Sequence, residues 1–77
     1  MNQIELKSVI LKVLSSVAPD VETNEIIENE NFRDQFDFDS MDFLNFAIGL
    51  SKELKKEIPE RDYQKLSSLK NCIANFY

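Results

Sequence analysis

The stretch FDFDSMDFLNFAIGLSKELKK, residues 36–56, contains the start and the full length of a predicted helix. Asp39 is a favourable N-cap residue, and Asp42, three residues later, is placed like the acid of a capping box. Both carboxylates also suit the positive end of the helix dipole. We therefore expect a helix that begins at Asp39 or Ser40 and runs to about Lys56.

Apolar residues cover most of the circumference of this predicted helix. Leu44, Ala47 and Ile48 form one apolar arc. Four further residues widen it: Phe43, Phe46, Leu50 and Leu54. A helix that is apolar over so much of its surface is buried on more than one side. We therefore expect it to be the central helix of a small bundle.

A second strong helix is predicted from Gln3 to Val17. Its apolar residues fall on one helical face: Leu6, Ile10, Val13, Leu14 and Val17. Pro19 ends it, because the proline ring disfavours a helical conformation at the preceding residue. The following stretch, from Pro19 to Asp39, is a long acidic connection in which Phe32 and Phe36 predict one short helical turn. Its isoleucines and phenylalanines are expected to hold it on the core: Ile26, Ile27, Phe32 and Phe36.

Two more helices follow the central one. Pro59 is well placed at the first position of a short helix over residues 60–65, and Ser67 or Ser68 caps a last helix with apolar residues at helical spacing: Leu69, Cys72, Ile73 and Phe76. The predicted fold is all-α, a small four-helix bundle of three main helices and one short helix, with a long loop between the first two. We expect residues 1–77 to form a single domain.

Composition excludes several classes of function. The chain of 77 residues has no His and a single Cys, so Ser-His-Asp and Cys-His nucleophile systems and the common zinc sites are absent. The net charge of −5 disfavours nucleic acid and anionic membranes and favours partners with basic patches. The sequence has no charged start followed by an apolar run and no apolar run of about 18 residues, so we expect neither a signal peptide nor a membrane span. We expect a cytoplasmic monomer that is not an enzyme.

Calcium binding through the aspartates near Ser40 is also disfavoured. A helix–loop–helix calcium loop counted from Asp37 requires Gly at its sixth position and Glu at its twelfth. Those positions hold Asp42 and Ile48. We predict no metal site, and we interpret Cys72 as a small buried core residue.

Ser40 is the residue with the clearest chemical potential. It lies where the long loop meets the central helix, so we expect its hydroxyl to face solvent. The chain supplies no base to activate it, but an external enzyme could modify it. A phosphate ester here would be repelled by the neighbouring acids Asp37, Asp39 and Asp42, and it should remain in solvent. The simpler alternative is that Ser40 is only an ordinary helix-start residue.

The run Asp39-Ser40-Met41, followed by Ile58-Pro59 and the later helix spacings, resembles the acyl carrier proteins over essentially the whole chain. The resemblance implies that a phosphopantetheinyl transferase moves 4′-phosphopantetheine from coenzyme A onto Ser40, making the chain a phosphoprotein. Acyl groups would then be carried as thioesters on this arm, for fatty acid, polyketide or related lipid biosynthesis. The alternative is a non-carrier interaction module in which the serine is unmodified.

The resemblance also implies where partner enzymes bind. Acyl-loading and acyl-processing enzymes with basic docking patches would contact the helix that begins at the serine, and the matching positions are Asp39, Met41, Asp42, Phe43 and Asn45. The last two lie where we expect the helix surface to be partly open.

Three departures from the family pattern indicate a specialised member. Asp37 stands where the family usually has Gly, and we expect Asp to tolerate a left-handed backbone there. The docking helix is less acidic than in carriers of ordinary fatty acid synthesis, as Asn45, Ser51 and Lys52 show. Four phenylalanines at core positions would narrow any passage for an acyl chain and favour short or polar cargo: Phe32, Phe36, Phe46 and Phe76. The alternative is a soft bundle that opens to the chain.

Overall fold

The computed structural model describes residues 2–77. Three longer helices, α1 (Gln3–Val17), α3 (Ser40–Leu54) and α4 (Leu69–Phe76), pack around one core. Shorter elements connect them, namely the 3₁₀ helices η1 (Thr23–Glu25) and η2 (Glu60–Leu66) and the single-turn helix α2 (Phe32–Gln35). The predicted all-α fold is confirmed, since residues 2–77 contain only one isolated β-bridge and no strand.

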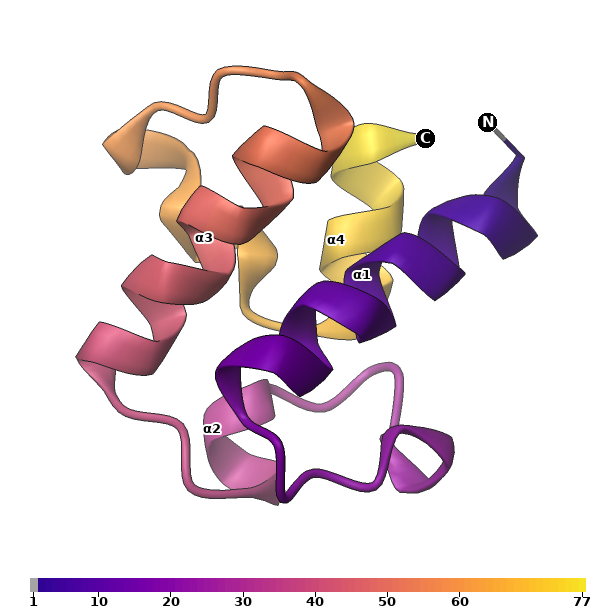
Figure 1. The fold of residues 1–77 in the computed structure, drawn as a ribbon, viewed down its shortest axis with the longest axis vertical. Coiled ribbons are helices and arrows are strands. Elements are labelled where there is room, and N and C mark those ends of the chain that lie inside the picture. Colours follow the sequence, from indigo (N-terminus) through magenta and orange to yellow (C-terminus); the bar gives the residue numbers. More distant parts are fainter. Residues whose placement is uncertain (1) are drawn as a thin grey trace.

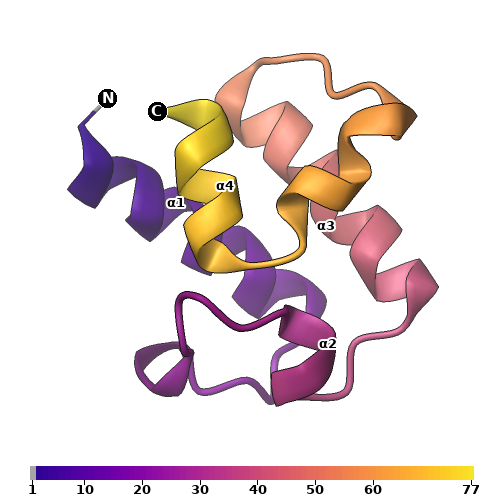
Figure 2. The same ribbon diagram turned by 180° about the vertical axis from the view of Figure 1, so that it is seen from behind.

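The helices form a small bundle whose long connection closes one end. In Figure 1, α1 lies beside α3 with α4 behind it, and the segment that carries α2 runs across the lower end. Figure 2, from the opposite side, shows α4 in front of α1 and the orange segment of η2 between α3 and α4. This arrangement leaves the start of α3 at the same end as the long connection.

The bounds of α1 match the prediction at both ends. Asn2 caps the helix, because its Oδ1 accepts a hydrogen bond from the Glu5 amide at 2.8 Å. The helix stops at Val17, directly before the residue that precedes Pro19. Four residues of its apolar face are buried, as the helical spacing predicts: Leu6, Ile10, Val13 and Leu14.

Helix α3 begins as predicted but ends earlier, at Leu54. The Lys55 backbone is left-handed, with φ of 53°, and this conformation terminates the helix. The Lys56 amide donates to the Ser51 carbonyl at 3.1 Å, and the Ser51 hydroxyl donates to the Lys56 carbonyl at 2.6 Å. These two bonds satisfy backbone groups at the helix end and fix the turn into the next segment.

The long connection is held on the bundle by Ser67, between η2 and α4, and by Lys70 in the first turn of α4. The Phe32 amide donates to the Ser67 carbonyl at 2.8 Å, and the Lys70 amide donates to the Glu28 carbonyl at 2.8 Å. Phe32 is fully buried, as expected, and Ile26 packs against the core, but Ile27 remains 50 % exposed. Backbone pairing, the phenylalanines of the connection and Ile26 therefore fix this loop, and Ile27 does not.

Six aromatic residues, here called the aromatic cluster, fill the end of the core beneath the start of α3: Phe32, Phe36, Phe38, Phe43, Phe46 and Tyr63. Phe32 and Phe46 are completely buried and meet edge-to-face, with ring centroids 5.5 Å apart. Phe38 contacts both of them and also Phe43. The elements at this end are thus joined through one continuous set of ring contacts.

Gly49 allows α1 and α3 to approach closely. A Cβ atom at this position would lie 2.7 Å from the Val13 Cγ1 atom, which is closer than two carbons pack. A glycine inside a helix costs about 1 kcal/mol relative to alanine. The close contact with α1 explains why the helix contains one here.

The expectation that α3 is buried on more than one side is wrong for part of its surface. Leu44 and Ile48, assigned to a buried arc, are 37 % and 42 % exposed, and Met41 is 63 % exposed. We call these three residues the apolar stripe of α3. Helical spacing groups them on one face, but whether a neighbour covers that face depends on how the other helices pack, and none of the described elements covers it.

Candidate functional site

Ser40 is the first residue of α3 and is exposed. Its position is fixed by two aspartates at the helix start, Asp39 and Asp42. The Asp39 Oδ1 atom accepts a hydrogen bond from the Asp42 amide at 2.9 Å, and the Asp42 Oδ2 atom accepts one from the Asp39 amide at 3.2 Å. The predicted capping box is confirmed. It holds the serine on a rigid helix start.

Both carboxylates of the capping box are occupied with backbone amides next to Ser40. A third carboxylate, Asp37, lies on the exposed loop just before them. A phosphate ester on the serine would meet these negative charges at the helix start, so repulsion directs it away from the helix and into solvent. The site thus keeps the phosphate of an attached group in solvent.

Asp37, which stands where the resemblance leads us to expect Gly, causes no backbone strain. Among the non-glycine residues of the described chain, Lys55 alone has a positive φ. Asp37 therefore does not adopt the left-handed conformation that would favour glycine. The loop before Ser40 reaches the helix start without it.

A shallow groove of about 350 Å³ opens beside Ser40, between α3 and η2. Its lining combines apolar rings and methyl groups with polar groups at the edge: Ser40, Phe43, Leu44, Glu60, Tyr63 and Gln64. Phe43 and Tyr63 are stacked, with centroids 6.5 Å apart and planes 22° from parallel. The groove gives a group attached to Ser40 an apolar surface on which to lie.

The residues proposed for partner recognition take different positions around Ser40. Asp39, Met41 and Asn45 are exposed, and Asp42 is partly exposed. Phe43 is half-buried and belongs to the groove and the aromatic cluster, so it does not share their open surface. Leu44 and Ile48 are also exposed, although the sequence predicts them in a buried arc; their spacing of three and seven from Met41 is the signal that places them on the same face as this exposed residue.

The charge of the chain is concentrated at the Ser40 end. Residues 19–42 contain one cation, Arg33, and nine carboxylates: Asp20, Glu22, Glu25, Glu28, Glu30, Asp34, Asp37, Asp39 and Asp42. Cations gather instead at the far end of α3, at Lys52, Lys55 and Lys56. A partner with a basic surface would therefore be attracted more strongly to the Ser40 end than to the other, where Glu53 and Glu57 offset two of the three lysines.

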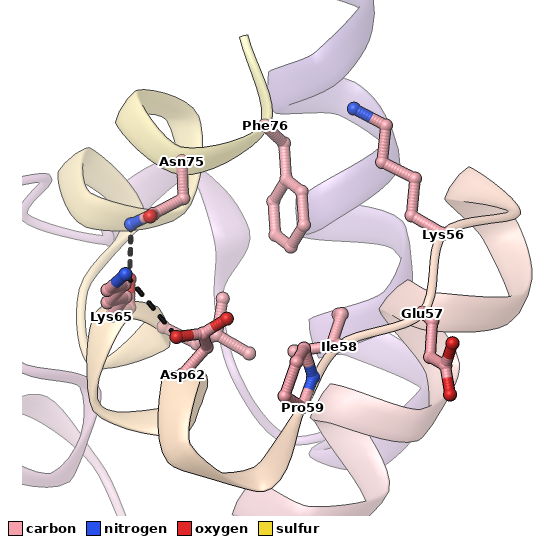
Figure 3. A pocket seen from close by; sticks show the side chains of 9 residues that line it. Lys56, Glu57, Ile58, Pro59, Asp62, Lys65, Asn75 and Phe76 are labelled. Atoms are coloured by element: carbon pink, nitrogen blue, oxygen red, sulfur yellow. Dashed lines mark hydrogen bonds and ion pairs between the residues drawn. The ribbon is translucent and has the colours of Figure 1, made fainter.

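Another hollow, of about 210 Å³, lies near the far end of α3, away from Ser40 (Figure 3). Phe76 faces Ile58 and Pro59 across it. The Lys65 ammonium forms an ion pair with Asp62 at 3.3 Å, and the Asn75 side-chain amide donates to the Lys65 carbonyl at 3.1 Å. Asp62, Lys65 and Asn75 are thus engaged with one another, and no serine or thiol lines the hollow, so it offers no hydroxyl or thiol for attachment.

Cys72 is a core residue, as predicted. Its side chain is fully buried and its thiol Sγ lies 3.5 Å from the Leu66 carbonyl, to which it donates. Burial raises the pKa of the Cys72 thiol from 9.0 to about 12. The thiolate, which is the reactive form, is therefore suppressed at neutral pH.

Residues 2–77 lack two features that would indicate other functions. No cluster of three or more His, Cys, Asp or Glu side chains is arranged to hold a metal ion. None of the helices is long and apolar enough to span a membrane.

A small helical bundle that presents an exposed serine on a capped helix, beside an apolar groove, has the architecture of a carrier domain. The chain matches the family described as "Phosphopantetheine attachment site" over residues 8–75 and belongs to it. It is 29 % identical over 73 residues to the acyl carrier protein of Buchnera aphidicola subsp. Schizaphis graminum, covering 95 % of this chain and 89 % of that one. It is 31 % identical over 55 residues to the acyl carrier protein of Lactobacillus acidophilus, covering 71 % and 69 %.

The chain is therefore a carrier with a covalently attached 4′-phosphopantetheine group, and the resemblance to acyl carrier proteins is confirmed. Carriers of this family are generally not catalysts, and they interact with a phosphopantetheinyl transferase and with biosynthetic enzymes. The observed structure fits the group, since an exposed hydroxyl for the ester and an apolar groove for the arm lie side by side at Ser40.

Proposed function

We propose that Ser40 is the attachment point of the 4′-phosphopantetheine group, and that the chain carries acyl intermediates for fatty acid, polyketide or related lipid biosynthesis. The observation that carries this proposal is the position of Ser40, exposed on a rigid, capped helix start and opening into the groove. When bound, the group supplies a terminal thiol on which acyl groups are held as thioesters. The chain itself acts as a single domain and catalyses nothing.

The transferase must supply the base for attachment. The Ser40 oxygen forms a bond to the β-phosphorus of coenzyme A, the bond from that phosphorus to the bridging oxygen breaks, and 3′,5′-adenosine diphosphate leaves. The hydroxyl proton passes to the transferase, because the chain has no histidine and the neighbouring carboxylates of Asp39 and Asp42 already accept backbone amides. The role of Asp39 and Asp42 is to hold the helix start, and with it the serine, in a fixed position.

The surface around Ser40 suggests how partner enzymes bind. Asp39 and Asp42 offer negative charge to a basic docking patch, and such rim charges act mainly on the association rate. Met41 and Asn45, with Leu44 and Ile48 of the apolar stripe, offer the central contact surface. Phe43 contributes from within the groove, where it would contact the arm.

The partners are proposed to be a specialised set. Beyond Asp42, the exposed residues of α3 include Asn45 and Lys52, and only Glu53 is acidic. The attraction for a basic patch thus comes from the long connection and the helix start. A docking enzyme would meet a mainly apolar surface on the helix itself.

Intact-mass spectrometry tests the attachment. The purified chain is incubated with coenzyme A, Mg²⁺ and a broad-specificity phosphopantetheinyl transferase. We expect one 4′-phosphopantetheine adduct on the wild type and on Ser51→Ala, and none on Ser40→Ala. Absence of the adduct from the wild type, or an adduct on Ser40→Ala, would favour the alternative of a non-carrier interaction module.

A further inference from the structure

The groove beside Ser40 ends at an aromatic wall. Ser40, where the arm would be attached, lines the groove, and so do the stacked rings of Phe43 and Tyr63, of which Phe43 contacts the buried Phe38. The two rings come from different elements, α3 and η2, so the stack closes the gap between them. A group lying in the groove meets this wall before it reaches the core.

The space behind the wall is already filled. Phe43 contacts Phe38 with a centroid distance of 6.0 Å, and Phe38 contacts Phe46 at the same distance. Phe46 and Phe32 are fully buried, and Phe38 is 5 % exposed. Forcing additional methylenes into a close-packed core displaces side chains and costs stability.

Resting on the proposed attachment at Ser40, we propose that Phe43 and Tyr63 restrict the acyl cargo that the carrier shelters to short groups. A short group lies in the groove, against the face of the stack and beside Leu44. The distal part of a long chain stays outside the bundle, in contact with solvent or with a partner enzyme. Phe43 and Tyr63 are in this view the residues that determine cargo length.

Thermal unfolding of loaded carriers tests this proposal. The transferase is supplied with acetyl-coenzyme A or octanoyl-coenzyme A, so that Ser40 receives the arm with its cargo. Each methylene buried in the protein would raise Tm by about 3–6 °C in a domain of this size. We expect the Tm of the octanoyl form to lie within about 2 °C of the acetyl form. An octanoyl form about 10 °C more stable would overturn the proposal.

A variant that opens the wall provides the second arm of the test. Phe43→Ala removes one ring of the stack, and we expect its octanoyl form to melt about 10 °C above its own acetyl form, as burial of two to three methylenes would give. Leu44→Ala is the matched control, because Leu44 lines the same groove but takes no part in the Phe43–Tyr63 stack. Phe43→Leu replaces Phe43→Ala if the latter does not fold. Equal Tm values for the two cargo forms of the opened variant would also overturn the proposal.

The mass of each sample separates this inference from the proposed function. If no acyl-phosphopantetheine adduct forms on Ser40, the proposed attachment itself fails. If the adduct forms and the octanoyl chain stabilises the wild type, only the length restriction fails.

Discussion

The two ends of α3 differ in charge, packing and the way the backbone is held. At the start, a capping box of Asp39 and Asp42 fixes the helix, acidic residues surround it, and aromatic rings pack beneath it. At the end, a left-handed Lys55 terminates the helix among lysines. Each end lies beside a hollow, but only the first hollow is lined by an exposed serine.

This difference shows that a site is better recognised by its chemistry than by its shape. The hollow of Figure 3 is bordered by groups that satisfy one another, such as the Asp62–Lys65 ion pair. The groove at the other end combines a rigidly placed hydroxyl with an open apolar surface. Variants at the two ends and in the middle of α3 can break or sharpen the comparison.

The largest effect is expected from the aromatic cluster. Phe46→Ala should lower the free energy of unfolding by about 3–5 kcal/mol, because it removes a fully buried ring and leaves a cavity. Phe76→Ala, at the far end, is the matched control; its ring is partly exposed, so it should cost clearly less. Urea unfolding followed by circular dichroism measures both. Similar losses would show that the two ends are equally well packed.

A smaller loss is expected in the middle of the helix. Gly49→Ala gains helix propensity, but its new methyl would contact Val13 at 2.7 Å, so we expect a net loss of about 1 kcal/mol. Asn45→Ala, on the exposed side of the same helix, should be neutral or slightly stabilising. A stabilised Gly49→Ala protein would mean that α1 moves away from α3 at little cost.

Loss of the cap should affect the Ser40 end alone. Asp39→Ala removes the acceptor for the Asp42 amide and should cost about 1 kcal/mol of stability. Amide hydrogen exchange should become faster in the first turn of α3 and remain unchanged in its last turn. Uniformly faster exchange would show that the cap acts on the whole bundle.

The ionisation of Cys72 should make the free energy of unfolding depend on pH in the alkaline range and not near neutral pH. Its folded-state pKa is raised to about 12, so the unfolded chain loses the thiol proton first as pH rises. The resulting stabilisation is fully present below about pH 9 and is lost between pH 9 and 12. The stability difference between wild type and Cys72→Ala should therefore shrink over this range. A constant difference would contradict the assigned burial of the thiol.

Local signals predicted much of this structure. The capping residues and the spacing of apolar residues predict both ends of α1 and the start of α3, because helix ends of this kind depend on residues that are close in sequence. The early end of α3 was missed, since nothing in the sequence showed that Lys55 would become left-handed. The pairing of Asn31 with Ser68 could not be predicted, because it depends on packing between distant segments.

The candidate site, like the fold, could be predicted from the sequence only in part. Ser40 and its capping aspartates were found from a short motif, whereas the groove needs Phe43 and Tyr63 from separate elements. The exposure of Leu44 and Ile48 was misinterpreted, because helical periodicity identifies a face without showing whether another element covers it.

Mass spectrometry of the protein purified from its own cells tests the central claim most directly. After proteolysis, the peptide that contains Ser40 should carry 4′-phosphopantetheine, with part of the population bearing an acyl group on the terminal thiol. The mass of that group would identify the cargo, and the length restriction predicts a short one. A Ser40 peptide that is unmodified throughout, or an arm attached to another serine, would contradict this account.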